Sequence, residues 1–165
     1  MTDNPCFESA PTWKAARALL SFPPIEPRFT FGYDLRSIRI HVRDHKLREL
    51  SVEDRTLEAH YGGFVFTQSR KGIGEARRWA LEVRYGPSGR EARVAGFPAR
   101  TYELGPEPPP DDIDPREPAV ITWHDADMFY LIASDQMTSE KLLRIAESLY
   151  KGRRRRPRHE KRSPT

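Results

Sequence analysis

The stretch AVITWHDADMFYLIAS at residues 119–134 decides the fold of this chain. It holds two runs of β-branched and aromatic residues, a composition that is typical of β-strands. The acidic segment His124–Asp127 lies between the two runs and has the composition of a tight turn. We therefore predict a β-hairpin whose strands are Ala119–Trp123 and Met128–Ser134.

The next stretch, TSEKLLRIAESL at residues 138–149, has apolar residues three and four positions apart, which predicts an amphipathic helix. Thr138 is a suitable N-cap for a helix over Ser139–Lys151. The apolar stripe would dock on two aromatic side chains that face each other across the hairpin, a pair that contributes about 0.2–1 kcal/mol. The predicted structural motif consists of Trp123, Tyr130, Leu142, Ile145 and Leu149.

Outside this unit, short segments separated by Gly and Pro predict further strands. An N-terminal helix is predicted over Trp13–Leu20, with Thr12 as its N-cap and Phe22-Pro23-Pro24 after its end. Short hairpin connections favour an antiparallel sheet. The further predicted strands are Ser37–Arg43, Thr56–Tyr61, Phe64–Gln68, Trp79–Tyr85, Glu91–Val94 and Ala99–Leu104.

Length and composition limit the chain to one domain. With 165 residues and 37% hydrophobic content, it can form one core of ordinary size. We expect an α+β fold, an antiparallel β-sheet of hairpins with the N-terminal and C-terminal helices packed on one face. The domain would span residues 12–151 and include a surface loop at 105–118 that holds six prolines. Residues 1–11 would be a flexible N-terminus, and residues 152–165 a disordered basic tail.

The net charge of +4 is unevenly distributed along the chain. Residues 151–165 hold eight Lys and Arg against Glu160, a net charge of +7, which leaves −3 for residues 1–150. An arginine run can bind the phosphates of nucleic acid or of an anionic surface, or it can be only a solubilising end. The run holds no aromatic residues to stack on bases. The candidate anion-binding residues are Arg153, Arg154, Arg155, Arg156 and Arg158.

The chain has no apolar run long enough for a membrane-spanning helix or a secretory signal, so we expect a cytoplasmic location for the chain as encoded. Cys6 is the only cysteine, which excludes an intramolecular disulfide and a cysteine-based metal site.

A glycine-rich segment, Thr67–Gly74, follows a predicted strand and is similar to the phosphate-binding turn of short-chain dehydrogenases. Gln68 stands where that turn needs its first glycine. Too few residues follow for the remaining βαβ units of such an enzyme. A glycine-rich loop between strands is the simpler interpretation, and an enzyme that uses Arg70, Lys71 and His124 on a phosphorylated substrate is the least supported class.

Two groups of histidines and acids are candidates for metal binding or acid–base chemistry. His41 and His45 have a spacing that suits zinc on a helix, but on a strand it separates them by about 13 Å. His124, Asp125 and Asp127 fall in a turn exposed to water, which does not perturb their pKa values as catalysis requires. We therefore predict no catalytic, cofactor-binding or metal-ligating residues.

The C-terminal third resembles a bacterial domain of unknown function that occurs on the extracytoplasmic side of anti-sigma factors and in related envelope proteins. The resemblance rests on the strand that ends in Trp123, the acidic turn, the strand with Tyr130 and the helix that follows. Gly32–Leu35 and Val94–Ala99 are similar to earlier parts of that family, so the resemblance covers most of residues 12–151. It implies a sensing or protein-binding module in an extracytoplasmic setting, without known chemistry.

The sequence therefore predicts a non-enzymatic binding or regulatory module that uses no cofactor. A protein segment or a small apolar ligand would occupy the sheet face or a groove between sheet and helices. The alternative function is binding of nucleic acid or an anionic surface through the tail. A nucleic-acid complex of that kind would weaken steeply with salt.

Overall fold

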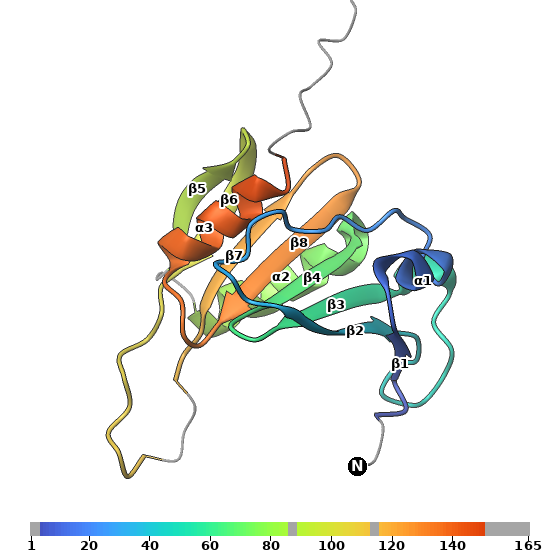
Figure 1. The fold of residues 1–165 in the computed structure, drawn as a ribbon, viewed down its shortest axis with the longest axis horizontal. Coiled ribbons are helices and arrows are strands. Elements are labelled where there is room, and N and C mark those ends of the chain that lie inside the picture. Colours follow the sequence, from blue (N-terminus) through green and yellow to red (C-terminus); the bar gives the residue numbers. More distant parts are fainter. Residues whose placement is uncertain (1–3, 86–88, 113–115, 151–165) are drawn as a thin grey trace, which may run out of the picture.

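The computed structural model describes residues 4–85, 89–112 and 116–150, in which eight strands form one antiparallel sheet (Figure 1). The strands are β1 (Phe7–Ala10), β2 (Leu35–His41), β3 (Thr56–Tyr61), β4 (Val65–Arg70), β5 (Arg90–Val94), β6 (Phe97–Tyr102), β7 (Ala119–His124) and β8 (Met128–Ser134). The helices are α1 (Trp13–Ala18), α2 (Lys71–Tyr85) and α3 (Ser139–Ser148), with a 3-10 turn, η1, at Val52–Asp54. The structure is therefore mostly β, with a few short helices.

The sheet consists of two four-stranded halves, with strand order β1-β2-β3-β4-β8-β7-β6-β5. The chain fills the first half from the edge to the centre and then crosses through α2 to the opposite edge. It returns strand by strand until β8 pairs with β4 at the centre. The antiparallel sheet predicted from the hairpin pattern is confirmed.

The predicted C-terminal hairpin is confirmed as β7 and β8, with Trp123 in register with Tyr130. Their rings stack with centroids 5.1 Å apart. The indole Nε1 of Trp123 donates a hydrogen bond of 2.8 Å to the hydroxyl of Tyr150, just beyond α3. Helix α3 ends at Ser148, earlier than predicted, and its buried side chains join the same core cluster: Leu142, Ile145 and Ala146, with Leu149 at the C-cap.

The predicted N-terminal helix is present as α1, and the hydroxyl of Thr12 accepts a hydrogen bond from the backbone N–H of Ala15, as its N-cap role requires. Strand β1 lies within the first eleven residues, which the sequence pattern leaves outside the domain. It pairs with β2, buries Ala10 and stacks Phe7 on His41 with centroids 4.9 Å apart. The local sequence pattern does not predict β1, because this strand is held by pairing with β2, which is distant in the chain.

Residues 21–34 cross the sheet as a segment that is held by side chains rather than by strand pairing. Gln68, fully buried on β4, accepts a hydrogen bond from the N–H of Ile25 at 2.8 Å and donates one to its carbonyl at 2.7 Å. Farther along, the hydroxyl of Ser148 on α3 accepts a hydrogen bond from the N–H of Phe29 at 3.2 Å. These contacts fix the segment over the sheet.

The predicted strand over Trp79–Tyr85 is wrong, because this segment is the second half of α2. Apolar residues at every second position imitate the period of a strand, yet Trp79 is 69% exposed. The helix lies directly on β8 at Gly74, where any side chain would overlap the ring of Phe129. Packing against distant residues can override the secondary structure that a local alternation of apolar residues favours.

Helices cover both faces of the sheet, so the expectation of helices on one face is not confirmed. Phe129 and Tyr130 are consecutive in β8 and therefore point to opposite faces. Helix α2 packs on the face of Phe129, and α3 packs on the face of Tyr130. Figure 1 shows α3 in front of β7 and β8, with α2 behind them.

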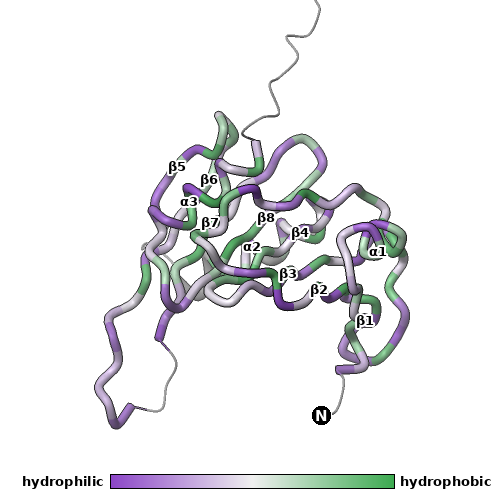
Figure 2. The backbone as a smooth tube through the Cα atoms, in the orientation of Figure 1, coloured by the Kyte–Doolittle hydropathy of each residue, from purple (hydrophilic) through white to green (hydrophobic). Residues whose placement is uncertain are grey.

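Hydropathy follows this layering. Figure 2 shows hydrophobic stretches in the central strands and hydrophilic ones in the outer turns and in the long projecting loop before β7. Residues 105–112 and 116–118 of that loop form no helix or strand. In the part of the chain that the structure describes, no helix combines the length and apolar character that a membrane crossing requires.

Candidate anion-binding site

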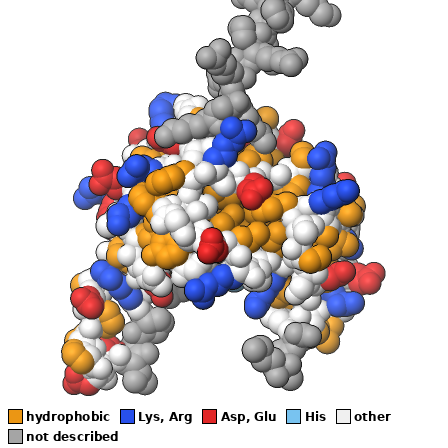
Figure 3. Space-filling model, in the orientation of Figure 1, with side chains coloured by type: hydrophobic (Ala, Val, Ile, Leu, Met, Phe, Trp, Pro, Cys, Tyr) orange, Lys and Arg blue, Asp and Glu red, His pale blue; other side chains and the backbone are white. Residues whose placement is uncertain are grey.

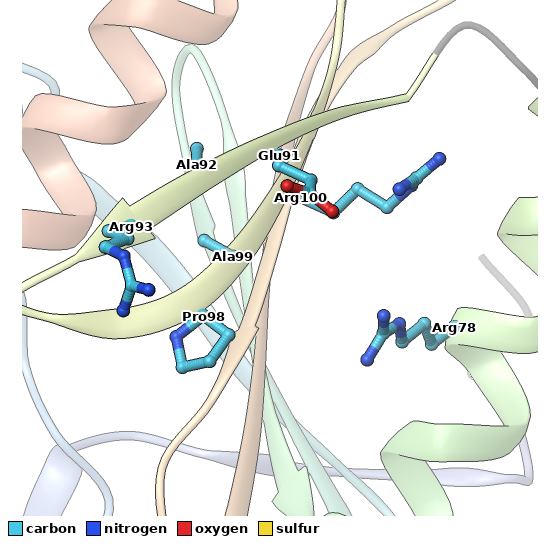
Figure 4. A pocket seen from close by; sticks show the side chains of 7 residues that line it. All are labelled: Arg78, Glu91, Ala92, Arg93, Pro98, Ala99 and Arg100. Carbon is cyan, nitrogen blue, oxygen red and sulfur yellow. The ribbon is translucent and has the colours of Figure 1, made fainter.

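A hollow of about 430 Å³ lies between α2 and the β5–β6 hairpin (Figure 4). Its volume is within the range that small-molecule sites occupy. Figure 4 shows the side chains of Arg78 from α2 and Arg100 from β6 extending into the same gap. The lining residues are Arg78, Glu91, Ala92, Arg93, Pro98, Ala99 and Arg100.

Strand register brings these side chains to one face of the hairpin. Arg100 is paired with Glu91, and Pro98 is paired with Arg93, so the four side chains share a face. Arg100 is also paired with Thr122 on β7, and Thr122 is paired with Leu131 on β8. Leu131 is two positions from Phe129 and therefore lies on the face that α2 covers. The hairpin therefore turns its charged face toward the helix that carries Arg78.

Arg100 is partly buried in the site. Its Nε is buried and has no hydrogen-bond partner among the residues that the structure describes. Gly89 permits this position, since a Cβ there would lie 2.5 Å from the Nε of Arg100. A buried guanidinium N–H without a partner carries a desolvation cost that an anionic acceptor would remove.

The other two arginines hold different positions around the hollow. Arg93 is exposed and donates a hydrogen bond of 3.0 Å from Nη1 to the carbonyl of Gly96, which directs its guanidinium along the hairpin. Arg78 is partly buried on α2. With Glu91 as the acidic side chain of the lining, the formal charge of the hollow is +2.

A narrower hollow of about 30 Å³ shares Arg78, Pro98, Ala99 and Arg100 with this one. It adds Thr122, Trp123, His124 and Phe129 to the lining. His124 was expected in a turn exposed to water, but it ends β7 and is partly buried. His124 and Thr122 therefore line a narrow space beside Arg78 and Arg100.

The arrangement suits recognition of carboxylate or phosphate groups. Each guanidinium presents N–H donors in a plane that matches two oxygens of such a group. The guanidinium groups of Arg78 and Arg100, which extend into the same gap, also repel each other, and a bound anion would reduce that repulsion.

The other sequence candidates are placed apart from this hollow. In the glycine-rich segment, Arg70 donates hydrogen bonds to the hydroxyl and the carbonyl of Ser21, and Lys71 is 4.0 Å from Glu75 one helical turn away. Arg70 therefore holds a loop, and Gly74 seats α2 on the sheet. Of the three residues considered for a phosphorylated substrate, Arg70, Lys71 and His124, the structure brings only His124 to the candidate site.

The histidine and cysteine candidates are also accounted for by local contacts. His41 stacks on Phe7, whereas His45 is exposed in the turn after β2. Asp125 Oδ2 is 3.5 Å from the hydroxyl of Tyr150. The thiol of Cys6 donates to the carbonyl of Asp44 at 3.4 Å. Within residues 4–85, 89–112 and 116–150, no group of three or more His, Cys, Asp or Glu is placed to hold a metal ion.

The arginines proposed for the tail lie outside the described residues: Arg153, Arg154, Arg155, Arg156 and Arg158. The structural motif predicted around Trp123 and Tyr130 lies in the core on the opposite face from α2. Its side chains are at most 2% exposed, so they fill the space between the sheet and α3.

A second surface, formed by Phe29 and Phe31 beside α3, is explained by packing within the chain. The guanidinium of Arg144 lies 5.3 Å from the ring centre of Phe29 and 5.1 Å from that of Phe31. Lys141 lies 5.7 Å from the ring centre of Phe31. Figure 3 shows hydrophobic side chains interspersed with Lys and Arg on this side of the molecule. Cation–π contacts of this kind hold residues 21–34 against α3.

The sequence pattern alone does not mark Arg78, Arg93 or Arg100 as site residues. A strand over residues 79–85 leaves no helix opposite the β5–β6 hairpin, so no groove is expected there. The signal in the sequence is the alternation in residues 90–94, which places Glu91 and Arg93 on one face, and the register of the hairpin then brings Arg100 to that face.

Comparisons of the chain with family models, with curated proteins and with solved structures gave no match. The functional argument therefore depends on the geometry of the site.

Proposed function

We propose that this chain is a non-enzymatic binding module that takes an anionic ligand, one with carboxylate or phosphate groups, in the hollow between α2 and the β5–β6 hairpin. The observation that carries the proposal is the lining of one hollow by Arg78, Arg93 and Arg100 against a single acidic residue, Glu91. Arginines from a helix and from two strands meet there only because of the tertiary fold.

The charge of the hollow favours an anion over the apolar ligand expected from the sequence. An apolar ligand would leave the buried Nε of Arg100 without an acceptor among the described residues. A carboxylate or phosphate would accept charge-assisted hydrogen bonds, which are about twice as strong as neutral ones. A ligand of this kind stabilises the folded chain by mass action.

A regulatory role belongs to the same proposal. A sensing or regulatory module is what the sequence leads us to expect, and a ligand that spans α2 and the β5–β6 hairpin would couple the helix to the edge of the sheet. Ligand occupancy would then be the signal that the module transmits.

Titration calorimetry tests the proposal with citrate and pyrophosphate as anionic probes and glycerol as the neutral probe. Arg100→Met keeps most of the side-chain volume without the charge, and it should weaken binding of an anionic probe by about tenfold or more. Arg39→Met, at an exposed position on β2, is the matched control and should leave the affinity unchanged. The full chain is used throughout, so the tail contributes equally to every variant.

Anion binding that Arg100→Met and Arg78→Met leave as strong as in the unmodified chain would overturn the proposal. So would a failure of both anionic probes to bind at concentrations of about 10 mM, where even weak specific complexes form.

A further inference from the structure

Strand β5 is an edge of the sheet, because it is last in the strand order and pairs with β6 alone among the described strands. Figure 1 shows it at the rim, beyond β6. An edge strand presents N–H and C=O groups to which another strand can pair. The residues of β5 indicate which strand that is.

The β5–β6 hairpin determines which backbone groups of β5 face outward. Val94 is paired with Phe97 across a two-residue turn whose residues, Ala95 and Gly96, have φ of 49° and 87°. In hairpins of this kind the pair that flanks the turn is hydrogen-bonded, and such pairs alternate along the ladder. Ala92 therefore bonds to β6, and its two neighbours in the strand direct their N–H and C=O groups toward the outer edge.

Pro98 agrees with this pattern. It has no N–H, and it stands opposite Arg93, in a pair that needs no hydrogen bond between β5 and β6. The outward-facing backbone groups are therefore those of Glu91 and Arg93.

The two residues whose backbone faces outward carry opposite charges, and both are exposed. If a second copy of β5 pairs antiparallel about a two-fold axis at Ala92, Glu91 of each copy lies opposite Arg93 of the other. A register centred on Glu91 or on Arg93 instead places like charges opposite each other, which is unfavourable. The strand is thus self-complementary in both hydrogen bonding and charge, as a two-fold interface requires.

We propose that two copies of this chain associate through β5, antiparallel and centred on Ala92, into one continuous sheet. The partner is a second copy because the pattern of β5 complements itself, with two opposite-charge pairs on one face. This pairing does not depend on anion binding, although Glu91 and Arg93 also line the hollow and the second copy would lie beside it. Five residues form a small interface, so we expect a concentration-dependent equilibrium between monomer and dimer.

Sedimentation equilibrium tests the charge pairing. Arg93→Glu gives a chain with two acids at the edge, and Glu91→Arg gives a chain with two bases, so each variant should dimerise about tenfold more weakly or worse. A 1:1 mixture of the two variants should restore association, because each acid then faces a base. Glu8→Arg, an exposed change on the opposite edge strand β1, is the control and should dimerise like the unmodified chain.

A crosslink tests the register. Ala92 of one copy would face Ala92 of the other in a non-hydrogen-bonded pair, with Cα atoms about 4.5 Å apart, within disulfide range. In a Cys6→Ser background, Ala92→Cys should form an interchain disulfide on mild oxidation, and Arg39→Cys on β2 should not. A chain that stays monomeric up to about 1 mM overturns the proposal. Dimers that both charge variants leave intact, or a variant mixture that does not associate, overturn it as well.

Discussion

Replacing Gln68 with Leu tests how residues 21–34 are held on the sheet. Gln68 is fully buried and is bonded to both backbone polar groups of Ile25, at 2.8 and 2.7 Å. The substitution keeps the side-chain volume but leaves the N–H and the C=O of Ile25 without partners. Each buried group left unsatisfied costs about 1–3 kcal/mol, and the added apolar burial offsets part of this. We expect the free energy of unfolding to fall by about 2–4 kcal/mol.

Urea unfolding measures that change, and hydrogen exchange reports the backbone N–H of Ile25 directly. Gln136→Leu, at an exposed position after β8, is the matched control and should change the free energy of unfolding by less than about 0.5 kcal/mol. The reasoning is refuted if Gln68→Leu costs less than about 1 kcal/mol and the Ile25 amide keeps its protection, because the two hydrogen bonds would then not hold the segment.

Three further predictions address α2, a turn and the tail. Gly74→Ala places a Cβ against Phe129 and should lower the free energy of unfolding by about 1–3 kcal/mol. Gly72→Ala, with open space around it on the same helix, is the control and should be neutral or stabilising by up to about 1 kcal/mol. Equal effects of the two substitutions in urea unfolding would show that α2 is not packed on β8. The backbone N–H of Arg48 bonds to Asp44 and holds the pKa of that carboxyl below 3.8. Because the folded-state pKa is the lower one, the stabilisation is present above pH 3.8 and is lost as the pH falls through the folded pKa, and an NMR titration midpoint at or above 3.8 would contradict it. A chain that ends at Tyr150 should lose salt-dependent binding to a DNA duplex but keep pyrophosphate binding, and DNA binding that survives the truncation, measured by fluorescence anisotropy, would exclude the tail as its source.

Much of the fold follows from local pattern. The alternating residues of β7 and β8, the acidic turn and the apolar stripe of α3 are each determined within a few residues, and Trp123 and Tyr130 are paired as expected. Thr12 and Thr138 cap α1 and α3 because the N-cap hydrogen bond involves only residues three positions apart.

The rest depends on contacts between distant residues. Alternation of apolar residues in Trp79–Tyr85 suits a strand, but the segment is helical, and Gly74 of the same helix packs on Phe129 of the distant strand β8. The partners of Gln68 lie 43 residues earlier in the chain. The candidate site needs α2, β5 and β6 together, so the error over residues 79–85 also hid the arginine-lined hollow.

The central claim is that anions bind between α2 and the β5–β6 hairpin. The most direct measurement is a titration of the full chain with pyrophosphate, followed through the backbone amide resonances in two-dimensional NMR spectra. We predict that the resonances of Arg78, Glu91–Arg93 and Ala99–Arg100 shift together and saturate with one affinity. Shifts confined to residues 151–165, or to the α3 face around Trp123, would contradict the account.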